Sequence, residues 1–131
     1  MSFWDNIRYF KPSEFDSPDA PGTGYHMDED FVLLLDALRE AVGFPLRINS
    51  GFRTKEHNKL VGGKPTSAHT KSVAVDTRCV SAHYRFRILE EAYRLGFRRI
   101  GIGETFIHLD SDLSLPQEVL WTYPSSETPR R

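Results

Sequence analysis

The stretch Ser67-Ala-His-Thr-Lys-Ser-Val-Ala-Val-Asp76 places a histidine before, and an aspartate after, a short segment rich in valine and alanine. The β-branched and small residues between positions 73 and 77 favour a β-strand, in which Ala74 and Asp76 would point to the same face. Burying a carboxylate on such a strand is costly unless a cation or several hydrogen bonds meet it. We therefore expect Asp76 to have a partner of that kind.

A second candidate strand, Phe106-Ile-His-Leu-Asp110, carries another histidine. Ile107 and Leu109 would take one face of this strand, so that His108 and Asp110 lie on the other. The alternation predicts a strand with one apolar face, directed toward the core, and one polar face that is available for chemistry.

His69, Asp76 and His108 together have the composition of a zinc site. Zinc binds imidazole nitrogen and carboxylate oxygen, and a hydrolytic zinc site keeps its fourth tetrahedral position for water. The residues alone also allow a loop histidine, a turn-capping aspartate and a hydrogen-bonded core histidine, because no helix fixes their spacing as it does in an H-E-x-x-H motif. We predict that the three residues bind one Zn²⁺ ion.

The pattern S-x-H-x-x-[GS]-x-A-x-D, with S-G-F-R before it and F-I-H-L-D after it, resembles the zinc D-alanyl-D-alanine carboxypeptidase family. The similarity runs over roughly residues 11–123. It implies an α+β fold of the hedgehog/D,D-peptidase type, with a small antiparallel sheet and flanking helices. It also implies that His69, Asp76 and His108 are the zinc ligands and that Arg53 contacts the substrate.

Ser72 departs from the pattern of the family, because relatives of this type usually have glycine at this position. Glycine reaches positive φ angles without steric cost, whereas serine does not. If the turn before the Asp76 strand requires a positive φ, Ser72 is therefore expected to carry backbone strain.

Arg53 is the cation best suited to hold a substrate. It ends the sequence Ser50-Gly51-Phe52-Arg53, which is predicted to turn the chain into a short helix. A guanidinium binds a carboxylate through two parallel hydrogen bonds, which suits the C-terminal or D-glutamate carboxylate of a peptide. Without the resemblance, an ordinary surface salt bridge would explain the same arginine.

Two acidic residues are candidates for the catalytic base of such an enzyme. Glu104 precedes His108 by four residues. Related enzymes place a catalytic carboxylate a few residues before the corresponding histidine, although their usual spacing is not matched here. Asp110 follows His108 on the same predicted strand face, where it could equally hold the imidazole of the ligand in place. The sequence leaves both roles open.

Length and composition limit the possible partners. The 131 residues suffice for one domain, residues 1–131, with its own core, and the single cysteine excludes an internal disulfide. A net charge of −1 gives no general attraction to nucleic acid, and no segment approaches the length of a membrane span. We expect a monomer without nucleic-acid or membrane partners. The start of the sequence lacks the pattern of a signal peptide, which predicts synthesis in the cytoplasm.

The rest of the sequence predicts helices and strands around these motifs. Residues 1–27 are rich in proline and glycine and are expected to wrap the surface as an arm, and residues 124–131 are expected to form a loose tail. Apolar residues at three- and four-residue steps predict amphipathic helices. The expected helices cover 28–42, 54–60 and 81–95, and the expected strands cover 46–49, 73–77, 97–103, 106–110 and 119–123.

These features favour a zinc peptidase that cleaves the stem peptides of peptidoglycan. The resemblance allows either an L-alanyl-D-glutamate endopeptidase or a D-alanyl-D-alanine carboxypeptidase. The small size, the single domain and the missing signal peptide favour a phage-type endolysin that acts at the cell wall after another component releases it. The alternative is a non-catalytic module of the same fold, in which a zinc ion serves binding or virion assembly.

Overall fold

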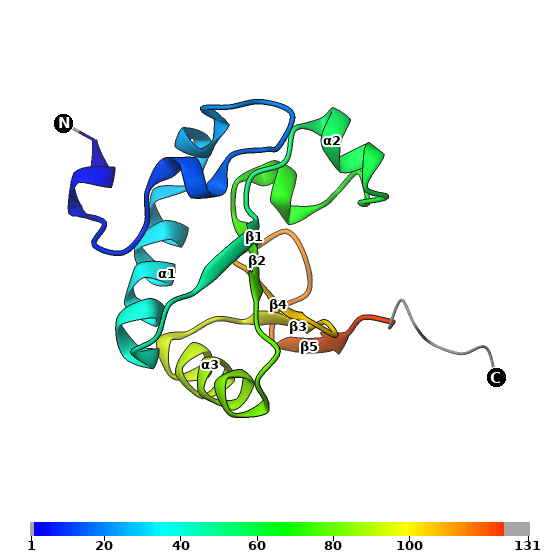
Figure 1. The fold of residues 1–131 in the computed structure, drawn as a ribbon. Coiled ribbons are helices and arrows are strands. Elements are labelled where there is room, and N and C mark those ends of the chain that lie inside the picture. Colours follow the sequence, from blue (N-terminus) through cyan, green and yellow to red (C-terminus); the bar gives the residue numbers. More distant parts are fainter. Residues whose placement is uncertain (1, 125–131) are drawn as a thin grey trace.

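The computed structural model describes residues 2–124, so the predicted tail lies outside the described residues from position 125 onward. The chain has an α+β fold in which one five-stranded sheet packs against helices (Figure 1). The strands are β1 (Arg47–Ser50), β2 (Ala74–Arg78), β3 (Arg99–Ile102), β4 (Phe106–Asp110) and β5 (Val119–Thr122), and the α-helices are α1 (Glu29–Val42), α2 (Lys55–Leu60) and α3 (Ala82–Leu95).

Each predicted helix and strand is present, with boundaries shifted by at most two residues. The helices begin one residue later than expected because Asp28, Thr54 and Ser81 are N-caps, whose side chains accept a hydrogen bond from a backbone N–H of the first turn. Gly43 and Gly96 end α1 and α3 in the left-handed conformation that favours glycine.

The sheet is mixed, with the strand order β1-β2-β4-β3-β5. β1, β2, β4 and β3 pair antiparallel in that order, but β5 runs parallel to β3, with Val119 opposite Arg99. The chain leaves β4 at Asp110, which lies opposite Arg99 at the start of β3, and the next loop returns it to the same end of the strands. β5 must therefore run opposite to β4 and alongside β3. The expected antiparallel pairing is confirmed for β1, β2, β4 and β3, and β5 makes the sheet mixed.

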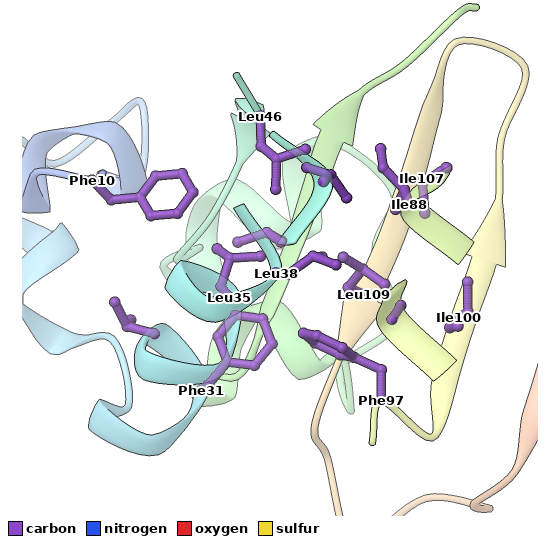
Figure 2. Close-up of a cluster of buried hydrophobic side chains, with 14 of the residues drawn as sticks. Phe10, Phe31, Leu35, Leu38, Leu46, Ile88, Phe97, Ile100, Ile107 and Leu109 are labelled. Carbon is purple, nitrogen blue, oxygen red and sulfur yellow. The ribbon is translucent and has the colours of Figure 1, made fainter. Parts of the chain in front are cut away.

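The hydrophobic core lies between one face of the sheet and the helices α1 and α3 (Figure 2). Phe31 of α1 meets Phe97 edge to face, with ring centroids 6.3 Å apart. Side chains of both helices and of strands β3 and β4 fill this layer, and its fully buried members include Phe31, Leu35, Leu38, Ile88, Ile100, Ile107 and Leu109. Because Ile107 and Leu109 point into the core, His108 points to the opposite face of β4.

The segment before α1 lies on the outside of the molecule and reaches the loop that follows β1 (Figure 1). It contains three 3₁₀ turns, η1 (Phe3–Asn6), η2 (Pro12–Phe15) and η3 (Thr23–His26). The backbone N–H of Phe52 donates to the Phe15 carbonyl oxygen at 2.9 Å, and that of Thr54 donates to the Ser17 hydroxyl at 3.2 Å. The N-terminal segment therefore holds the loop that carries Arg53.

Candidate metal centre

Two of the predicted ligands face each other across the centre of the sheet. Asp76 of β2 lies directly opposite His108 of β4 in the antiparallel ladder, so both side chains leave the same face. The Nδ1 atom of His108 lies 2.9 Å from Oδ1 of Asp76. The carboxylate that the strand pattern left without an obvious partner is therefore met by a histidine of the neighbouring strand.

The third predicted ligand, His69, comes from the 3₁₀ turn η4 (Ala68–Lys71), which is capped by the side chain of Ser67. His69 is buried, and its Nδ1 atom lies 2.8 Å from the carbonyl oxygen of Gly51. Its Nε2 atom lies 3.4 Å from Oδ1 of Asp76, and its ring centroid is 5.2 Å from that of His108. The turn η4 thus places His69 next to Asp76 of β2 and His108 of β4.

Ser72 makes this arrangement possible by reversing the chain between η4 and β2. It has φ 69° and ψ 20°, a left-handed conformation, as the glycine of related sequences suggested. Left-handed backbone costs an L-residue about 1–2 kcal/mol, whereas glycine does not pay this steric term. The turn that joins two ligands is therefore strained in this chain.

Ser72→Gly should stabilise the protein by about 1 kcal/mol, because relief of the left-handed strain exceeds the extra flexibility of glycine in the unfolded chain. The measurement is the urea midpoint of both proteins at equal slope. Gly43→Ser is the matched control: it puts serine at φ 79° in open space and should lower stability by a similar amount. A less stable Ser72→Gly variant would show that the hydroxyl makes a contact worth more than the strain.

One nitrogen of each imidazole faces Asp76, and the hydrogen bond at the other nitrogen holds the ring in that direction. A carbonyl oxygen only accepts, so Nδ1 of His69 donates to Gly51, and Nε2, which faces Asp76, is the nitrogen placed to bind a metal. Nε2 of His108 lies 2.7 Å from Oδ2 of Asp110, which likewise leaves Nδ1 for a metal. Metal-binding histidines usually donate their other N–H to a carbonyl or a carboxylate in this way. The donor atoms of His69, Asp76 and His108 lie within 4.8 Å of one another, and the set fits zinc.

The electrostatics of the cluster keep its carboxylate ionised. Burial alone would raise the pKa of Asp76, but hydrogen bonds from His108 and His69 outweigh it and hold the pKa well below its ordinary value. Burial likewise opposes protonation of His108, but its hydrogen bonds to Asp110 and Asp76 leave its pKa raised. Asp76 is thus an anion at neutral pH, which is the form that binds a metal ion.

Asp110 lies where it can fix the orientation of His108. Its side chain is 1% exposed. Its Oδ2 atom accepts from His108, and its Oδ1 atom accepts from Nε of Arg99 at 2.8 Å and from the backbone N–H of Asp112 at 3.1 Å. All these contacts suit a residue that positions a ligand. Glu104, the other predicted base, is an exposed residue of the turn between β3 and β4 and does not line the cleft described below.

Arg53 lies beside the cluster, in the loop that follows β1. Its Nη2 atom is 3.5 Å from Oδ2 of Asp76, while Nε and Nη1 donate to Ser50 Oγ and Asn58 Oδ1, each at 3.2 Å. Asn58 also donates to the Lys64 carbonyl oxygen at 2.8 Å, so that its own orientation is fixed. The guanidinium is thus held in one direction, toward the candidate metal ligands.

Asn58 is a residue of the site that the sequence interpretation missed. It is 3% exposed, and a Cβ atom on Gly63 would lie 2.0 Å from its Oδ1 atom. Glycine at position 63 therefore leaves room for the side chain that holds Arg53. An asparagine five residues after an arginine, followed by paired glycines, was the available signal.

A cleft of about 610 Å³ opens beside the cluster. Its wall combines His108 and Asp110 with cationic and aromatic side chains from distant parts of the chain: Arg53, Lys64, Arg99, Trp121 and Tyr123. Burial is the main cause that raises the pKa of Tyr123, and the carboxylates of Asp76 and Asp110 raise it further. A cleft with these cations suits a substrate that carries carboxylates.

The family model for peptidase M15 matches residues 9–110, which include the three candidate ligands, Arg53 and Asp110. The chain belongs to the peptidase M15 family. This bears out the resemblance seen in the sequence and implies a zinc peptidase that acts on peptidoglycan-type substrates. The M15 match ends with β4, so β5, which contains Trp121, and Tyr123 after it lie outside the match.

No curated protein matches the sequence. Within residues 2–124, none of the helices of this M15 peptidase combines the length and the apolar character that crossing a membrane would require. Among the same residues, His69, Asp76 and His108 form the one group of three side chains placed to bind a metal ion.

Proposed function

We propose that this M15 family member hydrolyses stem peptides of peptidoglycan, as an L-alanyl-D-glutamate endopeptidase or a D-alanyl-D-alanine carboxypeptidase, and that it serves as a phage-type endolysin. The observation that supports this most directly is the convergence of His69, Asp76 and His108 beside a cleft that also contains Arg53. As an endolysin, it would act on the cell wall after another component releases it from the cytoplasm.

In this proposal the residues of the site divide the work of hydrolysis. His69, Asp76 and His108 hold the zinc ion, and Asp110 keeps the His108 ring in the orientation that directs Nδ1 at it. When bound, zinc polarises the scissile carbonyl and lowers the pKa of a bound water toward neutrality. Arg53, held by Ser50 and Asn58, binds a carboxylate of the peptide and so places the scissile bond.

The catalytic base is proposed to be one of two acidic residues, Glu104 or Asp110. If Glu104 is the base, Glu104→Gln should keep zinc but lose most of its turnover, because general-base catalysis typically contributes about 10²–10⁴-fold. Zinc content and initial rates on a soluble stem peptide measure the two effects. Full turnover of Glu104→Gln would pass the role to Asp110, whose oxygens accept hydrogen bonds from His108, Arg99 and Asp112.

Purified peptidoglycan provides the test of the function. The zinc-loaded protein should release new amino groups, a zinc chelator should stop the release, and a non-chelating isomer of the chelator should not. The product identifies the bond: an endopeptidase exposes the amino group of D-glutamate, whereas a carboxypeptidase liberates free D-alanine. Binding to the wall without any release would favour the non-catalytic module.

A further inference from the structure

A single row of residues crosses the sheet face that carries the ligands. Asp76 lies opposite His108, His108 opposite Gly101 of β3, and Gly101 opposite Trp121 of β5. Residues paired in this way project from the same face. Gly101 contributes no side chain, so the space between His108 and the last strand is left to Trp121 of β5 and to Tyr123, which follows it.

The rings of Trp121 and Tyr123 fill the space above Gly101. A Cβ atom there would lie 2.6 Å from Nε1 of Trp121 and 2.7 Å from Cε2 of Tyr123. The ring centroids of Trp121 and Tyr123 are 5.5 and 6.4 Å from that of His108. Glycine at position 101 therefore lets both aromatic side chains reach across β3 toward a candidate metal ligand.

Tyr123 is fixed at its backbone and along its ring. Its N–H donates to the Ile102 carbonyl oxygen at 3.0 Å, and its ring packs against Phe106 and Trp121 with centroid distances of 5.1 and 6.2 Å. It lines the same cleft as Arg53 and His108 and is 37% exposed. The side chain is thus partly exposed in the cleft, and its hydroxyl is influenced by a hydrogen bond with Trp121 and by the charges of Asp76, Asp110 and Arg53.

We propose that Tyr123 is a catalytic residue whose hydroxyl donates a hydrogen bond to the oxygen of the reacting carbonyl. This inference rests on the proposed peptidase function. Negative charge develops on that oxygen during attack, and a fixed donor directed at it stabilises the transition state more than the ground state. Tyr123 lines the same cleft as His108 and Arg53, so a peptide that Arg53 holds there would lie beside it. Tyr123 follows β5 and lies outside residues 9–110, which the family model matches.

Tyr123→Phe removes the hydroxyl and keeps the ring that packs on Phe106 and Trp121. In the zinc-loaded protein, kcat on a soluble stem peptide should fall about 10²-fold, with KM and zinc content unchanged, as for loss of one oxyanion donor. Tyr93→Phe is the matched control, because Tyr93 is an exposed tyrosine of α3 outside this cleft and should keep full activity. Equal thermal unfolding of the three proteins excludes a folding defect.

A binding measurement tests the same hydrogen bond without turnover. Phosphinate analogues of the two candidate dipeptides carry a tetrahedral anion in place of the scissile carbonyl. By calorimetry, Tyr123→Phe should bind the analogue of the cleaved dipeptide about tenfold more weakly than the wild type, whereas Tyr93→Phe should bind it equally well.

The possible outcomes separate the two proposals. Wild-type kcat and phosphinate affinity in Tyr123→Phe would overturn the role of Tyr123 and leave the peptidase function standing. A raised KM with unchanged kcat would also overturn it, because Tyr123 would then bind substrate and transition state alike. A wild-type protein that takes up zinc but neither cleaves wall peptides nor binds a phosphinate would overturn the peptidase function, and the catalytic role of Tyr123 with it.

Discussion

His69→Ala and His108→Ala should each abolish stoichiometric zinc binding and, with it, hydrolysis of the cell wall. The wild-type protein should take up about one zinc ion per chain, held by three protein ligands. Structural zinc sites with four protein ligands bind the ion with roughly 10–16 kcal/mol, which is about 3 kcal/mol for each ligand. Losing one ligand should therefore weaken zinc binding by at least about a hundredfold. The measurement is metal content after dialysis, followed by competition with a chelator of known affinity.

His57→Ala is the matched control for these variants. His57 lies on α2, outside the group formed by His69, Asp76 and His108, and its replacement should leave zinc content unchanged. Circular dichroism separates loss of metal from loss of fold. A stably folded wild-type protein that fails to take up added zinc, or a His108→Ala variant that keeps it, would contradict the assignment of the metal site.

Asp110→Asn should lower zinc affinity by about 10–100-fold, because the residue that orients a metal-binding imidazole usually has an effect of this size. It should also destabilise the fold by about 3 kcal/mol. Asp110 and Arg99 form a largely buried ion pair, with side chains 1% and 11% exposed, and neutralising one partner leaves the other charge without compensation. Chelator competition and urea unfolding of the metal-free protein measure the two effects separately.

Asp112→Asn provides the comparison for this prediction. Asp112 is also buried, but it pairs with Lys71 and Ser114 rather than with a candidate ligand. The Asp112→Asn variant should therefore be less stable than the wild type but bind zinc with the same affinity. Equal zinc affinity in Asp110→Asn and in the wild type would mean that the contact between Asp110 and His108 has no part in holding the metal.

The short-range features of the fold could be read from the sequence because each rests on a local pattern. Alternating residues in Phe106–Asp110 placed His108 and Ile107 on opposite faces, and apolar residues at three- and four-residue steps marked the helices. The family pattern also pointed to the left-handed turn at Ser72. In each case the physical cause lies within a few residues of its effect.

Features that depend on distant residues were missed or misjudged. The parallel direction of β5 follows from where the loop after β4 returns, which no alternation of residues encodes. Asn58 was overlooked because its partners are a side chain and a carbonyl group on different loops. Tyr123 was assigned only to a last strand, since nothing local indicates that glycine at position 101 leaves room for its ring. The roles predicted for Glu104 and Arg53 stay predictions.

The contact between the N-terminal segment and the loop after β1 affects how this protein can be shortened or fused to others. The carbonyl of Phe15 and the hydroxyl of Ser17 fix residues on both sides of Arg53, and a Cβ atom on Gly51 would lie 2.7 Å from Cα of Phe15. A fragment trimmed to the start of α1 would retain every metal ligand but lose the support of its substrate-facing arginine. The minimal unit for engineering therefore begins before Phe15.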